Sequence, residues 1–191
     1  MGKEGNRIDH VAAILDDLEA VADRPLTPED VQAFKDAVFE DSAAFTDILY
    51  SDRAYFIIGS YNTEEEERLL SVKQVLTGRR TGDHAFLMKE VTEFTRNFAL
   101  KFHVLSRRAD FVVGVFEHNQ GGHEWEAGAL SLPPLRTKTW ALKRTYATRA
   151  EEREAFDAMI AHFFDLLADH NQLLEWTTGT ELREQTKSEI P

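Results

Sequence analysis

The chain has 191 residues, no cysteine, 42% hydrophobic residues and a formal net charge of −12. These values exclude disulfides, a cysteine nucleophile and disorder as the main state, and so acidic a surface argues against binding to a nucleic-acid polymer. Because the first residues do not resemble a signal peptide and no run of about 18 apolar residues occurs, we expect a cytoplasmic protein with no membrane partner. The acidic composition is typical of halophilic proteins and also of ordinary acidic ones.

The first segment, residues 1–52, is predicted to be a helical hairpin. It carries much of the negative charge, since residues 1–53 contain 13 acidic and 5 basic side chains. Apolar residues recur at helical spacing from Ile8 to Leu18, and Thr27 with Pro28 is a typical start for a second helix. Two interpretations stay open: a hairpin packed on the main domain, or a module that forms a homodimer or docks a partner.

From residue 53 onward, short apolar runs alternate with helical patterns. Strands are predicted at 54–59, 85–88, 110–116, 137–143 and 173–177, and helices at 64–76, 92–106, 123–130 and 151–169. This alternation predicts an α/β domain over residues 53–180, with a doubly wound, flavodoxin-like parallel sheet of about five strands. The tail, residues 181–191, is expected to be helical or frayed. In such sheets, ligands bind at the carboxyl ends of the strands.

The loop after the first strand contains Gly59, Ser60, Tyr61 and Asn62. Four glutamates follow after Thr63, and they occupy the positive end of the helix dipole that a phosphate would need. A phosphate loop is therefore disfavoured, and no Gly-x-Gly-x-x-Gly motif occurs. The four loop residues are predicted to contact a sugar or a base; the alternative is that they only form the turn.

The loop after the third strand is the most informative stretch. Gly121 and Gly122 allow a sharp turn, and Glu124 and Glu126 then fall in the first turn of a helix, whose dipole is expected to keep a carboxylate ionised. A fixed carboxylate beside a second one, Glu117, is what glycosyl transfer requires. The alternative is an acidic helix start without chemistry. Gly128 is expected to let this helix lie close to the sheet.

The loop after the fourth strand begins with two cations, Lys143 and Arg144. They are predicted to hold the phosphate of a ligand; the alternative is that they pair with the glutamates that begin the next helix. His118 and His123 lie among glutamates, but their spacing matches no metal motif, so neither a metal nor a cofactor is predicted.

These motifs together resemble the nucleoside 2-deoxyribosyltransferase-like superfamily and the related TIR-like nucleotide-binding domains. The resemblance covers about residues 54–178 and rests on three stretches: Gly59-Ser60-Tyr61, Ala109 to Glu117, and Gly121-Gly122 followed by Glu126-Ala127-Gly128-Ala129-Leu130. It implies that Glu126 is the nucleophile that takes the sugar. It also implies an assisting residue at the end of the preceding strand, an aspartate in the family and Glu117 here.

Two hypotheses for function follow. The first is an enzyme that cleaves or transfers an N-glycosidic bond of a nucleoside, a nucleotide or NAD, with Glu126 as nucleophile and with Glu117 and His123 assisting. The second is a non-catalytic module of the same fold that senses a nucleotide or binds a protein.

Overall fold

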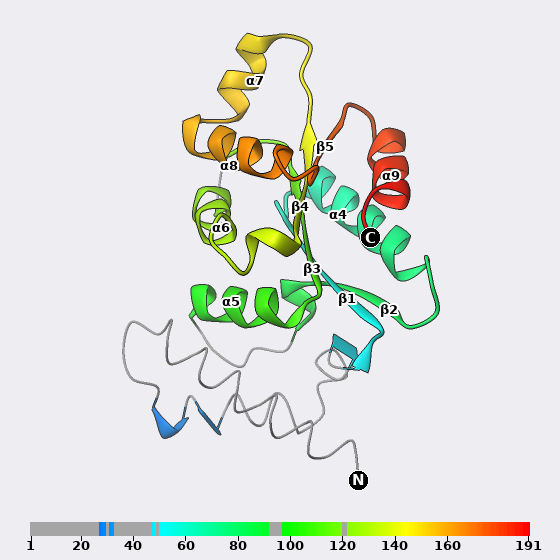
Figure 1. Cartoon of the computed structure of the whole chain (residues 1–191), viewed down its shortest axis with the longest axis vertical. Coiled ribbons are helices and arrows are strands. Elements are labelled where there is room, and N and C mark those ends of the chain that lie inside the picture. The colour runs from blue at the N-terminus through cyan, green and yellow to red at the C-terminus, as the bar shows by residue number, and fades with distance from the viewer. Residues whose placement is uncertain (1–26, 30, 33–46, 49, 92–96, 120–121) are drawn as a thin grey trace.

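The computed structural model contains one parallel sheet of five strands (Figure 1), in the spatial order β2-β1-β3-β4-β5. It describes residues 27–29, 31–32, 47–48, 50–91, 97–119 and 122–191. The strands are β1 (Arg53–Gly59), β2 (Asp83–Leu87), β3 (Phe111–Phe116), β4 (Thr139–Arg144) and β5 (Leu173–Trp176). Every neighbouring pair is parallel. The predicted doubly wound α/β class is therefore confirmed.

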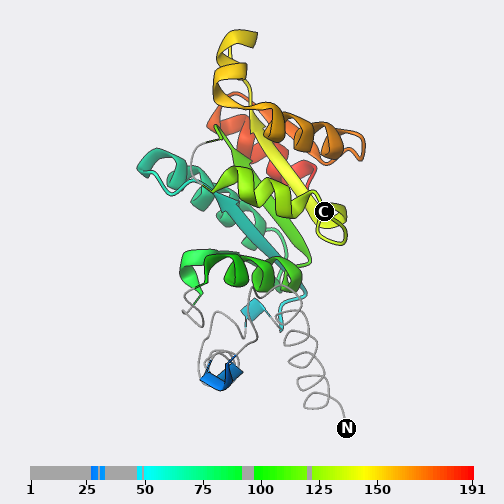
Figure 2. The same cartoon turned by 90° about the vertical axis from the view of Figure 1, so that its left-hand side faces the viewer.

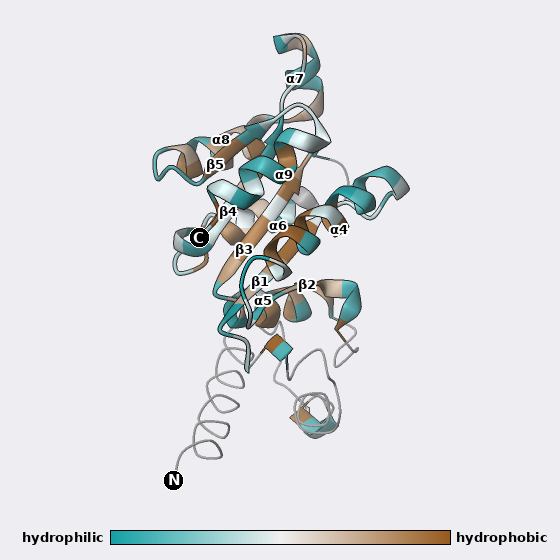
Figure 3. Ribbon diagram, turned by 90° about the vertical axis from the view of Figure 1, so that its right-hand side faces the viewer, coloured by the Kyte–Doolittle hydropathy of each residue, from teal (hydrophilic) through white to brown (hydrophobic). Residues whose placement is uncertain are grey.

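The helices lie on both faces of this sheet. They are α4 (Thr63–Thr77), α5 (Phe98–Arg108), α6 (His123–Leu130), α7 (Arg149–Ala155), α8 (Ala158–Ala168) and α9 (Gly179–Ser188). Figure 2 shows α5, α6 and α8 in front of one face, and Figure 3 shows α4 and α9 in front of the other. The predicted tail thus forms a helix, and its Leu182 is buried with the apolar residues of α4.

Strand alternation produces two separate apolar cores. In β1, Phe56 and Ile58 pack into the core beneath α5, α6 and α8, whereas Tyr55 and Ile57 pack into the core beneath α4 and α9. Successive side chains of a strand point to opposite faces, so a strand covered on both sides is apolar throughout its length. This explains the brown strands at the centre of Figure 3.

The strand order places a topological switch point between β1 and β3. The chain leaves β1 toward β2 on one side and later returns to add β3, β4 and β5 on the other. The connections that leave β1 and β3 therefore diverge at the carboxyl edge, and this divergence is where doubly wound sheets bind ligands. The loops after Gly59 and Phe116 flank this point.

Two local predictions are wrong. The helix expected over 151–169 is two helices, because the Asp157 side chain accepts hydrogen bonds from the backbone N–H groups of Met159 and Ile160 and so begins α8. Two large apolar side chains, Phe98 and Met159, are 51% and 59% exposed. Gly128 is exposed as well, and no described atom lies within 4 Å of the place where its Cβ would be.

Most of the predicted hairpin lies outside the described residues. At the expected start of its second helix, the Val31 backbone N–H donates to the Thr27 carbonyl at 3.0 Å, as a helical turn requires. Ile48 is buried in the same core as residues of α5. Within the described part of the chain, none of the helices has the length and apolar character needed to cross a bilayer.

Candidate active site

Gly59 ends β1 where three elements come close together. A Cβ at this position would lie 2.6 Å from the Leu69 Cδ2 of α4 and 2.9 Å from the Val115 carbonyl oxygen of β3. Only glycine fits such an approach without a shift of the backbone. The predicted ligand residue Gly59 therefore has a packing reason of its own.

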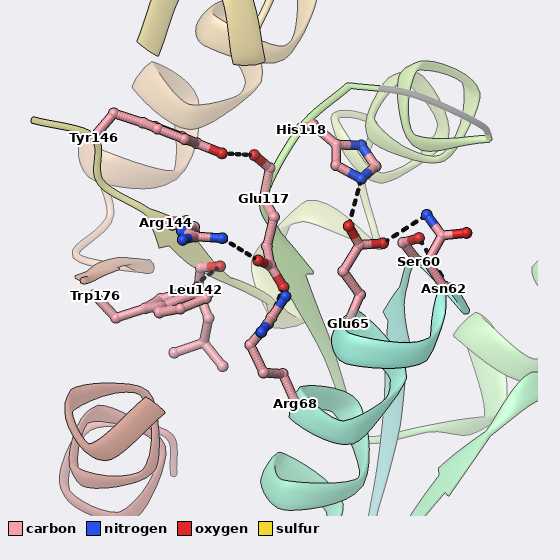
Figure 4. Close-up of polar contacts among 10 residues, drawn as sticks. All are labelled: Ser60, Asn62, Glu65, Arg68, Glu117, His118, Leu142, Arg144, Tyr146 and Trp176. Carbon is pink, nitrogen blue, oxygen red and sulfur yellow. Dashed lines mark hydrogen bonds and ion pairs between the residues drawn. The ribbon is translucent and has the colours of Figure 1, made fainter. Parts of the chain in front are cut away.

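The loop after Gly59 forms a small polar network with the loop after β3 (Figure 4). Glu65, on α4, accepts a hydrogen bond from the Asn62 amide at 3.0 Å and lies 2.9 Å from the Nε2 atom of His118. The Asn62 backbone N–H donates to the Ser60 hydroxyl at 3.4 Å. Burial raises the pKa of Glu65, but hydrogen bonds from Ser60 and His118 outweigh it and lower the pKa overall.

Glu117 follows β3 and is 4% exposed. Its two carboxylate oxygens are bound by different arginines: Arg68 of α4 bonds Oε1, and Arg144 of β4 bonds Oε2 at 2.9 Å. Its carbonyl accepts a hydrogen bond from the Tyr146 hydroxyl. Figure 4 shows the two guanidinium groups converging on this carboxylate. A buried carboxylate with both oxygens paired is a structural anchor that ties α4, β3 and β4 together.

Lys143 and Arg144, predicted to act on one phosphate, point to opposite faces of the sheet. Lys143 lies over the rings of Phe156 and Phe164, on the α8 side, whereas Arg144 lies over the ring of Trp176 and binds Glu117. Strand alternation requires this separation of adjacent residues. Both cations already have carboxylate partners, and those of Lys143 are Glu152 and Glu175.

Glu126 has surroundings of another kind. It lies in the first turn of α6 and is 7% exposed, and its Oε2 atom is buried with no hydrogen-bond partner among the described residues. Burial raises the pKa of this carboxyl to about 7. The expectation that the helix dipole keeps it fully ionised is therefore wrong, because desolvation outweighs the dipole. The carboxylate packs beside Gly122, where a Cβ would stand 3.8 Å from Oε1.

Tyr61 lies in the loop after β1 and is 43% exposed as a whole, but its hydroxyl is the more buried part of the side chain. Burial of its hydroxyl, together with the negative charge of Glu126, raises the pKa of Tyr61 to about 12. The ammonium group of Lys89 lies 5.6 Å from the centre of the Tyr61 ring. Tyr61 is therefore a protonated hydroxyl near the buried carboxyl, and it can donate a hydrogen bond at neutral pH.

The structure thus divides the predicted site residues into two groups. Glu117 and Arg144 form one group of polar contacts on the α4 side of the sheet, next to the group that contains Ser60 and Asn62. Glu126 lies on α6, which covers the opposite face, and no charged group of the described residues contributes to the shift of its pKa. The expected pairing of the Glu117 and Glu126 carboxylates is not formed. Gly121 and the His123 side chain lie outside the described part of the chain.

Sequence reasoning missed the role of Arg68, which binds Glu117. Arg68 lies between acidic residues and an apolar stripe, a position that is normally a solvated helix face. The roles of Arg68 and Tyr146 depend on contacts over 49 and 29 residues of sequence, which no local pattern encodes.

The chain combines a doubly wound α/β fold with a buried carboxyl at the switch point. It belongs to DUF8170, a family of unknown function, whose model matches residues 8–161. No curated protein and no solved structure matches it.

Proposed function

We propose that the protein cleaves or transfers the N-glycosidic bond of a nucleoside, a nucleotide or NAD, with Glu126 as the reacting carboxylate. The observation that carries the proposal is the Glu126 carboxyl itself: it is buried in the first turn of α6, and one of its oxygens has no partner among the described residues. An unpaired buried carboxyl destabilises the fold, so its presence is best explained by a ligand that completes the site.

The chemistry follows from the pKa of this group. At a pKa of about 7, a large fraction of Glu126 is ionised near neutral pH, and the nearly dry surroundings leave the carboxylate poorly solvated and reactive. It would form a bond to C1′ of the sugar while the C1′–N bond breaks and its electron pair leaves with the base. Water, or an acceptor base, would then displace Glu126 from C1′.

The departing base needs a proton. Glu117 was the predicted source, but both its oxygens are bound by arginines on the other side of the sheet. Tyr61, whose pKa is raised in part by the charge of Glu126, is protonated at neutral pH. Its pKa of about 12 makes it a weak acid, so we assign it a hydrogen bond to the base and not full transfer of the proton. His123, the first residue of α6, remains a predicted assistant.

The test is release of free base from a panel of nucleosides, nucleoside monophosphates and NAD, followed by liquid chromatography. We expect turnover by the native chain and a loss of about a hundredfold or more in Glu126→Gln. The kcat/KM value should rise with pH through about 7, because the ionised form attacks. Glu124→Gln is the matched control, since Glu124 lies in the same helical turn but is exposed.

The outcomes separate the two hypotheses. Equal base release by the native chain and Glu126→Gln would show that another group reacts. Binding of a nucleotide without turnover would favour the alternative, a nucleotide-sensing or protein-interaction module of the same fold. The pairing of Glu117 with two arginines is the observation that favours this alternative, because it removes the second carboxylate of a two-carboxylate mechanism.

A further inference from the structure

A cavity that Glu126 does not line lies where the carboxyl ends of β4 and β5 meet α7 and α8. Figure 1 shows α7 and α8 at the top of the molecule. The cavity has a volume of about 420 Å³, and small-molecule sites commonly fall between about 300 and 1,000 Å³. Its floor contains two phenyl rings, those of Phe156 and Phe164, which are almost fully buried.

Lys143, one of the charged residues of the lining, is already paired with two carboxylates. Lys143 is 9% exposed and lies 6.0 and 5.7 Å from the centres of the two floor rings. It forms ion pairs with Glu152 and with Glu175, the latter at 3.2 Å. Two carboxylates around one ammonium leave an excess of one negative charge at the base of the cavity. An incoming phosphate would be repelled there.

The remaining charges of the lining come from two helices. Arg149 and Arg153 are one turn apart on α7, are exposed, and have no ion-pair partner among the described residues. Asp165 lines the cavity from α8, and its carboxylate likewise has no partner in the described part of the chain. The lining therefore combines two cations from α7, an anion from α8 and two aromatic rings.

We propose that this cavity binds a free α-amino acid with an apolar side chain. The ligand carboxylate would lie on Arg149 and Arg153, where guanidinium groups form strong, oriented hydrogen bonds. Its ammonium group would face Asp165 and the excess negative charge around Lys143. Its side chain would pack on the two phenyl rings. A zwitterion with an apolar side chain carries charges and surface that match the cations, the anion and the rings of the lining. Glu126 does not line this cavity.

The test uses three probes that share a phenyl ring: L-phenylalanine, 3-phenylpropionate, which lacks the ammonium, and 2-phenylethylamine, which lacks the carboxylate. Isothermal titration with the full chain should show binding of L-phenylalanine and roughly tenfold weaker binding of each analogue, because each loses one charge-assisted contact. Arg153→Gln and Asp165→Asn should each weaken L-phenylalanine by a similar factor. Both residues are exposed, so both variants should fold.

Asp169→Asn is the matched control, because Asp169 is exposed one turn beyond Asp165 and does not line the cavity. Its affinity for L-phenylalanine should equal that of the native chain, as should that of Glu126→Gln. The proposal is overturned if the three probes bind equally, if Arg153→Gln and Asp165→Asn leave the affinity unchanged, or if L-phenylalanine does not bind at millimolar concentration.

Discussion

Two buried carboxylates follow β3 within ten residues of each other, and their surroundings are opposite. Glu117 is 4% exposed and has an arginine on each oxygen, whereas Glu126 is 7% exposed and has an oxygen with no described partner. Equal burial therefore does not mean equal function. A paired carboxylate stabilises the elements it joins, while an unpaired one lowers stability and is retained for another reason. Of the two carboxylates, Glu126 is therefore the stronger candidate for a functional role.

The largest loss of stability should come from removing the charge of Glu117, the paired carboxylate. Glu117→Gln removes the negative charge from between Arg68 and Arg144 and leaves two guanidinium groups facing each other. Loss of one partner from a buried ion pair costs about 3–5 kcal/mol, and partial exposure of both arginines reduces this to about 3 kcal/mol. Urea denaturation at pH 7 measures the change in the free energy of unfolding.

Glu175→Gln is the control for this measurement. It also removes an ion-pair partner, but the Glu175 side chain is 55% exposed and Lys143 keeps Glu152, so the loss should be much smaller. If the two variants lose equal stability, Glu117 is not the anchor inferred here.

The second-largest effect should come from Glu126→Gln, and this substitution should raise the free energy of unfolding where Glu117→Gln lowers it. The folded-state pKa of Glu126 is raised from 4.5 to about 7, so the folded state holds its proton more tightly than the unfolded state. Stability is then lost as pH rises from 4.5 through 7, by at most about 3 kcal/mol. Glu126→Gln should remove this loss and stabilise the protein at pH 8 by about 2 kcal/mol, since the buried amide retains part of the cost.

The same substitution should have little effect on stability at about pH 3, where Glu126 is protonated in both states. Denaturation of Glu126→Gln and of the native chain at both pH values gives the comparison. Glu67→Gln, an exposed change on α4, controls for the loss of one surface charge. A Glu126→Gln variant that is less stable at pH 8 would mean that the carboxylate has a partner after all.

The sequence predicted the elements better than the site, for a physical reason. Strands such as β1 and β3 are buried on both faces, so their apolar runs are visible locally. The break before α8 also has a local signal in the sequence, because Asp157 is a good helix cap. The apolar periodicity continues on both sides of Asp157, however, and by itself predicts one long helix. The opposite orientations of Lys143 and Arg144 follow from strand alternation and could likewise have been predicted.

The surroundings of the two carboxylates could not be predicted. Glu117 is paired only because the register of β3 with β4 and the path of α4 bring Arg144 and Arg68 to the same point. The burial of Glu126 depends on how α6 packs against its neighbours. Both follow from long-range packing, whereas the motif Glu126-x-Gly128 is local and would look the same on an exposed helix.

The smallest predicted effect is that of Glu65→Gln on stability. It still separates a hydrogen-bonded carboxylate from an unpaired one, because the free energy of unfolding should depend on pH with opposite sign in the two cases. The pKa of Glu65 is lowered: burial opposes the shift, but hydrogen bonds from Ser60 and His118 outweigh it. A lowered pKa gives stability that is present above the unfolded-state value of 4.5 and is lost as pH falls below it. Glu65→Gln should therefore cost under about 1 kcal/mol at pH 7 and almost nothing at pH 3. Denaturation of Glu65→Gln at both pH values, with Glu67→Gln as control, measures this; a larger loss at pH 3 would contradict it. Glu65 and Glu126 would then have opposite pH slopes, as a hydrogen-bonded carboxylate and an unpaired one should.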